Sequence, residues 1–146
     1  MTHLLDVNVL IALADPQHIS HATAHAWFEI EGSSGFATCP LVENGLVRII
    51  SHSRYCHPLA SPGDAAPFLK SLARHKHHQF WPDDLSLATS DLVDMQSLRT
   101  PGQVTDTYLL ALAVSRGGRL ATLDRRLSTD AVRGGRKALI FIGGQA

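Results

Sequence analysis

The chain has 146 residues, of which 45% are hydrophobic and 18% are charged. This length and composition are typical of a single folded domain, residues 1–146, and exclude a disordered chain or a charged coiled coil. No apolar run approaches the ~20 residues of a membrane span, so we expect no membrane segment and, from the N-terminal residues, no signal peptide. The two cysteines, Cys39 and Cys56, favour a reducing cytoplasm.

The charges are distributed unevenly, although the thirteen basic and thirteen acidic residues give a net charge of zero. Residues 1–47 carry five acidic side chains and no Lys or Arg, and residues 48–98 carry five of each sign. Residues 99–146 carry eight basic and three acidic side chains. This asymmetry means that the neutral sum does not exclude a nucleic-acid partner.

Short apolar segments alternate with segments of helical periodicity along the chain. The expected strands are 3–5, 36–38, 79–81, 119–123 and 138–142. The expected helices are about 7–13, 16–30, 40–50, 64–76 and 104–115, with one or two further short helices in 85–98. This alternation is typical of an α/β sandwich around a mainly parallel sheet of four or five strands. In such sheets, ligands bind at the carboxyl ends of the strands.

Four acidic residues are expected at that carboxyl edge. Asp6 and Asp124 directly follow expected strands, whereas Glu43 and Asp106 fall in the first turns of expected helices. Each has an ordinary explanation as a helix cap or as a partner of the helix dipole. This explanation is weakest for Glu43, because it lies among apolar residues and no basic residue precedes Arg48.

If the four carboxylates converge, their mutual repulsion requires a cation between them. A set of oxygen ligands suits Mg²⁺ or Mn²⁺. Such a centre polarises a phosphoryl group and lowers the pKa of a bound water. The hypothesis that follows is metal-dependent hydrolysis of phosphoesters.

Four motifs resemble those of the PIN-domain ribonucleases, most closely the toxin subunits of VapBC toxin–antitoxin systems. They are LLDVNVLIAL at 4–13, ENG at 43–45, TDTYLLA at 105–111 and ATLDR at 121–125. The resemblance extends over nearly the whole chain, and all four acidic positions are filled. The chain is least similar to the family at 51–63 and 83–100, which we expect to flank the pocket and to set which RNA is cut.

The resemblance implies a PIN-like α/β/α sandwich whose acidic pocket binds Mg²⁺ or Mn²⁺ and cleaves single-stranded or looped RNA to leave a 5′-phosphate. Asp6 and Asp106 would be the principal metal ligands. Glu43 and Asp124 would complete the pocket directly or through water.

Further features of the family follow from the same resemblance. Asn8 and Thr122 match the polar positions that orient the acids. The protein would form a homodimer, and the C-terminal segment of a cognate VapB-type antitoxin would block the pocket.

Seven of the eight basic residues after position 98 are Arg, which suits planar phosphate recognition better than Lys. Because they lie around Asp124 in the sequence, four of them are expected to bind RNA phosphates beside the pocket. These are Arg116, Arg119, Arg125 and Arg126.

Two other functions remain open from the sequence. A phosphatase with an aspartate nucleophile at Asp6 usually needs a second acid two residues later, where Asn8 stands. A non-catalytic RNA-binding regulatory module would not need four intact acids. A zinc site at His18, His21 and His25, or at His75, His77 and His78, is disfavoured because no cysteine lies at a suitable spacing.

Overall fold

The structure, a computed structural model, describes residues 1–143 and contains a five-stranded sheet. The strands are β1 His3–Leu5, β2 Phe36–Thr38, β3 His78–Phe80, β4 Arg119–Thr122 and β5 Leu139–Phe141. They lie in the order β3-β2-β1-β4-β5, and every neighbouring pair is parallel. The mainly parallel sheet predicted from the sequence is therefore confirmed, with β1 at its centre.

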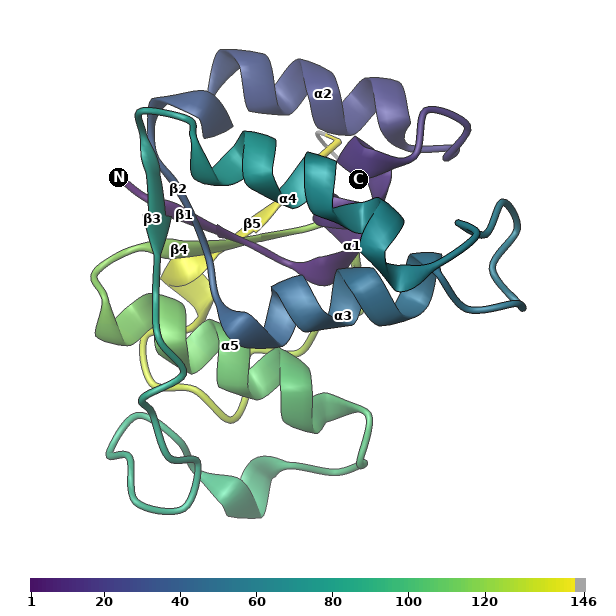
Figure 1. Cartoon of the computed structure of the whole chain (residues 1–146). Helices are drawn as coiled ribbons and strands as arrows, with labels where there is room; N and C mark the ends of the chain where they lie inside the picture. The colour runs from purple at the N-terminus through teal and green to yellow at the C-terminus, as the bar shows by residue number, and fades with distance from the viewer. Residues whose placement is uncertain (144–146) are drawn as a thin grey trace.

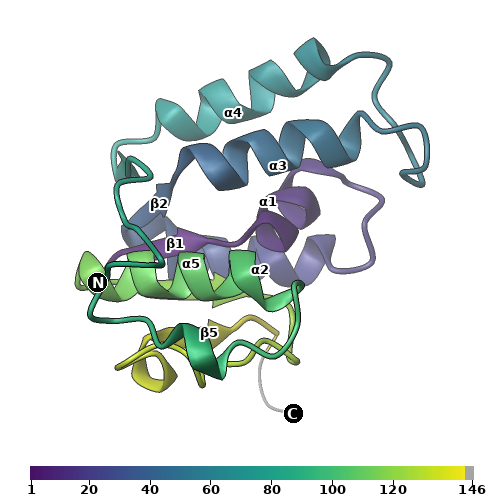
Figure 2. The same ribbon diagram turned by 90° about the horizontal axis from the view of Figure 1, so that it is seen from below.

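Helices connect the strands and cover both faces of the sheet, because parallel neighbours require a crossover. The helices are α1 Val7–Ala14, α2 His21–Ile30, α3 Pro40–Ile50, α4 Ala66–Ala73 and α5 Gln103–Ser115. Figure 1 shows α2 and α5 on opposite sides of the sheet, and Figure 2 shows α5 crossing it from below. This is an α/β/α sandwich, as predicted. Within residues 1–143, no helix is long and apolar enough to cross a membrane.

The core forms where the central strands meet the helices. Leu4 and Leu5 of β1 are fully buried, as is Leu120 of β4. Because both faces of these strands are covered, buried residues follow one another along them rather than alternating with exposed ones. The edge strands are less covered: β5, predicted as a strand from its run of apolar residues, leaves Phe141 36% exposed, since the sheet continues on only one side of it.

A pair of glycines turns the chain from α5 into β4. Gly117 has a φ of +68°, in the left-handed region that favours glycine. A Cβ on Gly118 would lie 2.6 Å from the carbonyl oxygen of Thr2. The chain can therefore pass close to β1 at this point and start β4 in register with it.

Two predicted helices differ from the structure. The helix predicted from about residue 16 begins at His21, because the side chain of Asp15 accepts the amide of Gln17 and sets a turn instead. The segment 85–98, predicted to hold one or two short helices, contains only a 3₁₀ turn at Met95–Ser97. Long-range backbone bonds hold this segment, from the Asp94 amide to Ala131 and from the Arg133 amide to Leu92.

The first histidine cluster closes the end of α1. A ring nitrogen of His21 lies 2.7 Å from the carbonyl oxygen of Ala12, and one of His25 lies 3.3 Å from that of Leu13. These are among the last carbonyls of the helix, which have no partner within it. The two rings also contact each other, with centroids 4.3 Å apart. The cluster therefore has a structural function in holding α2 against α1.

Candidate active site

Asp6 lies at the carboxyl end of β1, where it caps α1. One carboxylate oxygen accepts the amide of Val7 at 2.7 Å, and the other accepts the hydroxyl of Thr122 at 2.8 Å. The side chain is only 4% exposed. Burial raises the pKa of Asp6, and the nearby charge of Asp124 adds to this, while the bonds from Thr122, Val7 and Asn8 oppose it. Asp6 is therefore both the N-cap of α1 and a carboxyl group whose pKa is raised by its surroundings.

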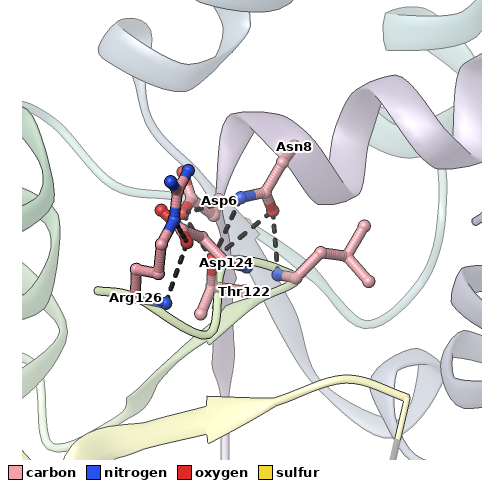
Figure 3. Close-up of polar contacts among 6 residues, drawn as sticks. Asp6, Asn8, Thr122, Asp124 and Arg126 are labelled. Atoms are coloured by element: carbon pink, nitrogen blue, oxygen red, sulfur yellow. Dashed lines mark hydrogen bonds and ion pairs between the residues drawn. The ribbon is translucent and has the colours of Figure 1, made fainter.

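Asn8 and Thr122 tie the ends of β1 and β4 together around Asp6 (Figure 3). The Asn8 amide donates to the Thr122 hydroxyl at 3.1 Å, and the Asn8 carbonyl oxygen accepts the amide of Leu123 at 3.0 Å. The fully buried Thr122 hydroxyl also accepts the amide of Asp124 at 3.1 Å. This network fixes the positions of two carboxylates from two strands.

Asp106, in the first turn of α5, and Asp124, just after β4, belong to the same electrostatic environment. Burial raises the pKa of Asp106 to about 6, with further contributions from the charges of Asp6 and Asp124. Like charges affect each other in this way only when they lie close together with little water between them. The Thr122 hydroxyl bonds both Asp6 and the amide of Asp124, and α5 packs on β1 and β4, so three of the four predicted acids lie at the same end of the sheet.

Glu43 has different neighbours. Its carboxylate accepts the hydroxyl of Thr38 at 2.6 Å, and that hydroxyl lies 2.7 Å from Nε2 of His78. Since the hydroxyl proton goes to Glu43, His78 donates to Thr38. A hydroxyl therefore engages one oxygen of Glu43, and no hydrogen bond within residues 1–143 joins Glu43 to the three aspartates.

Thr38 and His78 are not predicted from the sequence as residues of the site. The signal for Thr38 is its position at the end of a buried strand, five residues before Glu43. His78 reaches Thr38 because β2 pairs with β3. The pairing aligns Thr38 with Phe80, which lies two residues after His78 on the same strand. This register cannot be obtained from spacing alone.

The four arginines expected beside the pocket separate into two groups. Arg126 lies at the site: its Nε is 3.7 Å from Asp124, and its amide bonds the same carboxylate at 2.9 Å (Figure 3). Arg125 lies next to it in sequence, with its guanidinium 5.9 Å from the ring centroid of Phe141.

The expectation that Arg116 and Arg119 lie beside the pocket is wrong. Arg116 follows the far end of α5, ~15 Å along the helix from Asp106, and it bonds Asp84 at 2.9 Å. Arg119 begins β4, ~10 Å along the strand from Thr122, so it lies at the opposite edge of the sheet. Arg116 and Arg119 are close to Asp124 in the sequence but not in space, because β4 takes the chain from one end of the sheet to the other.

The side chains fit a small, hard divalent cation. Within residues 1–143, no three His, Cys, Asp or Glu side chains are grouped closely enough to enclose a metal ion. Mg²⁺ does not require such a cage, because it is usually held by one or two carboxylates, with waters and substrate phosphates completing its shell. Asp6, Asp106 and Asp124 provide this negative charge, since the charges of Asp6 and Asp124 help to raise the pKa of Asp106, and Asp6 and Asp106 are suitable ligands.

Comparison with known proteins agrees with this geometry. The PIN domain family profile matches residues 3–131. The chain belongs to the PIN-domain family. It is also 42% identical over 137 residues to Ribonuclease VapC44 of Mycobacterium tuberculosis, covering 94% of this chain and 96% of that protein.

Two further relatives from the same organism are similar over most of their length. Ribonuclease VapC39 is 42% identical over 134 residues, covering 92% of this chain and 96% of the relative. Ribonuclease VapC38 is 41% identical over 126 residues, covering 86% and 87%. These similarities identify this PIN domain as one of the VapC type.

Proposed function

We propose that this PIN domain is a Mg²⁺- or Mn²⁺-dependent endoribonuclease toxin that hydrolyses phosphodiester bonds in tRNA, rRNA or mRNA. The observation that carries the proposal is the electrostatic coupling of Asp6, Asp106 and Asp124 at the carboxyl edge of the sheet. Negative charges that act on one another in a partly buried site are unfavourable unless a cation binds beside them. The similarity to several VapC ribonucleases supports RNA as the substrate.

Each side chain has a defined task in this proposal. Asp6 and Asp106 would hold the ion, Asp124 would add negative charge beside them, and Glu43 would contribute from the first turn of α3 through water. When bound, a divalent ion polarises a phosphoryl oxygen and lowers the pKa of a water. Asn8 and Thr122 keep Asp6 and Asp124 in place through the hydrogen bonds described above.

Arg126 is the residue that we assign to the RNA phosphate beside the aspartates, with Arg125 next to it. The Arg126 side chain is 95% exposed and pairs with Asp124 at 3.7 Å. An exposed pair of this kind is weak, so a phosphate can replace the carboxylate as the partner of the guanidinium.

The same similarity leads us to propose a VapB-type antitoxin as the inhibitor, a homodimer as the assembly and the cytoplasm as the location. An antitoxin segment that inhibits the enzyme would have to cover the carboxyl edge of the sheet. Co-expression and co-purification with a candidate VapB-type antitoxin, followed by light scattering, test the complex and the dimer.

The test of the catalytic proposal uses purified protein and total RNA with Mg²⁺, Mn²⁺ or a chelator, alongside Asp6→Asn and Asp106→Asn. We expect cleavage only with metal and only by the wild type. Cleavage that survives the chelator or either substitution contradicts the proposal. A phospho-aspartyl intermediate at Asp6 would instead indicate the phosphatase, and RNA binding without cleavage in every condition would indicate a regulatory module.

A further inference from the structure

A second group of cationic side chains lies away from the aspartates, where α3 ends and the loop after it begins. Two surface hollows meet there. One, of about 570 Å³, is lined by Arg48, Ile49, His52, Arg54 and Tyr55. The other, of about 550 Å³, is lined by Asn44, Val47, Arg48, Ser51, His52 and Pro62. Because they share Arg48 and His52, we treat them as one feature, the α3 groove.

The α3 groove is positively charged. No acidic residue lines either hollow. In the part of the chain that the structure describes, neither Arg48 nor Arg54 forms an ion pair, and both are exposed. One lining residue, Tyr55, contacts a carboxylate, that of Asp15. This carboxylate is already engaged, since it accepts the Tyr55 hydroxyl at 2.5 Å and lies 3.8 Å from His57. The two guanidinium groups are therefore available to an anion.

The groove also offers flat side chains. The bond between Tyr55 and Asp15 ties the ring to the C-terminal cap of α1, so the ring is held in one orientation. Tyr and His rings and Arg guanidinium planes are the groups on which unpaired RNA bases stack. Arginines next to such rings are typical of sites for single-stranded nucleic acid, in which the phosphates provide most of the affinity.

The groove begins near the aspartates. Asn44 follows Glu43 directly in the first turn of α3. One residue further, a Cβ on Gly45 would lie 3.0 Å from Val7, the residue after Asp6, so α3 packs closely on α1 here. From Asn44 to the end of α3 at Ile50 the groove extends ~9 Å along the helix, and it continues to Ser51 and His52. Figure 1 shows the loop after α3 extending away from the sheet.

We propose that the α3 groove binds the single-stranded RNA that extends beyond the cleaved bond, with phosphates on Arg48 and Arg54 and a base against Tyr55. This inference rests on the proposed function, because it extends the substrate path of the same site. The loop that supplies Arg54 and Tyr55 lies in 51–63, one of the two segments that we expect from the sequence to set which RNA is cut. The groove is therefore a determinant of which RNA this chain selects.

Binding of a fluorescent single-stranded oligoribonucleotide, measured by anisotropy in chelator across a range of salt concentrations, tests the groove without cleavage. The test variant is Arg48→Ala/Arg54→Ala. The first control is Arg74→Ala, which removes an exposed arginine at the end of α4. The second, matched to the double test variant, is Arg74→Ala/Arg136→Ala, which removes two exposed arginines. All of these substitutions are of exposed side chains, and thermal melting verifies that each variant is folded.

We expect the test variant to bind the RNA about tenfold more weakly, because two phosphate contacts are lost. Its slope of log affinity against log salt should fall by about 1.4, since each contact to a single strand contributes about 0.7. The controls should match the wild type. If the test variant and the double control bind the RNA with equal affinities and equal salt slopes, the inference is overturned. It is also overturned if the test variant loses only its binding to the antitoxin.

Cleavage of two RNA lengths separates this inference from the proposed function. If both hold, the test variant cleaves a long RNA more slowly than the wild type but cleaves a short RNA, which ends before the groove, at the same rate. If the wild type cleaves neither RNA but the binding difference persists, the catalytic proposal fails and the groove stands. If the wild type and the test variant cleave both RNAs alike, the groove is overturned and the catalytic proposal stands.

Discussion

Replacing Asp106 with Asn should make the metal-free protein more stable at neutral pH and abolish RNA cleavage. The reason is that the charge of Asp106 is opposed by burial and by the charges of Asp6 and Asp124. Asn has nearly the same shape and no charge, so it removes the repulsion without leaving a cavity. A residue that is unfavourable for the fold and necessary for the reaction is expected at a functional site.

The size of the gain follows from the pKa. Asp106 has a pKa of about 6 in the folded protein against an ordinary value of 3.8. Each pKa unit corresponds to 1.36 kcal/mol, which gives an upper limit of about 3 kcal/mol for the full shift. Because Asp106 is only half-buried, solvent screening reduces this to about 1.5 kcal/mol. In a domain of this size, that raises the melting temperature by about 3–6 °C.

The sign of the pH dependence is also fixed. A raised carboxyl pKa means that the folded state binds the proton more tightly than the unfolded state. The stability that this proton provides is full below about pH 4 and is lost as the pH rises through about 6. The advantage of Asp106→Asn should therefore be largest at pH 7.5 and nearly absent at pH 4.

Calorimetry in chelator at both pH values measures this difference. Asp91→Asn, which removes an exposed carboxylate elsewhere, is the matched control and should leave the melting temperature within about a degree of wild type. A variant Asp106→Asn that is no more stable than wild type at pH 7.5, or that gains equally at pH 4, refutes the electrostatic argument.

Three further predictions follow from the same contacts. Thr122→Val removes the hydroxyl bonded to Asp6 and Asp124, so urea denaturation should show a loss of about 2–3 kcal/mol, whereas Thr122→Ser should retain most of the stability; equal losses would contradict the network. Adding Mg²⁺ should raise the melting temperature of the wild type more than that of Asp6→Asn, because binding to the folded state stabilises it; equal shifts would place the ion elsewhere. Arg116→Ala and Arg119→Ala should cleave RNA within about twofold of wild type, since both lie far from the aspartates; a tenfold loss in either would restore them to the RNA path.

The parts of the site that sequence predicted are those in which a strand leads directly into an acidic residue. Asp6 and Asp124 follow buried strands that are neighbours in the sheet, so knowing that the strands are parallel is enough to place both at one edge. Asp106 is similar, because it lies in the first turn of a long apolar helix that crosses β1 and β4. Local patterns therefore predicted these positions well.

The parts that sequence missed depend on contacts between distant residues. The partner of Glu43 is a hydroxyl oriented by a histidine 40 residues from that hydroxyl, and the conformation of 85–98 depends on its pairing of Val93 with Val132. Arg116 and Arg119 are close to Asp124 in sequence but separated from it by the length of β4. Spacing along the chain carries no information about such pairings, since they depend on how segments pack.

The central claim, that the three aspartates direct metal-dependent hydrolysis of RNA, is tested most directly by the ends of the cleaved strands. Mass spectrometry of a defined oligoribonucleotide after reaction with Mg²⁺ identifies these ends, with Asp6→Asn as the inactive control. The account predicts a 5′-phosphate and a 3′-hydroxyl from the wild type and no product from Asp6→Asn. A 2′,3′-cyclic phosphate, or the same products from Asp6→Asn, would contradict it.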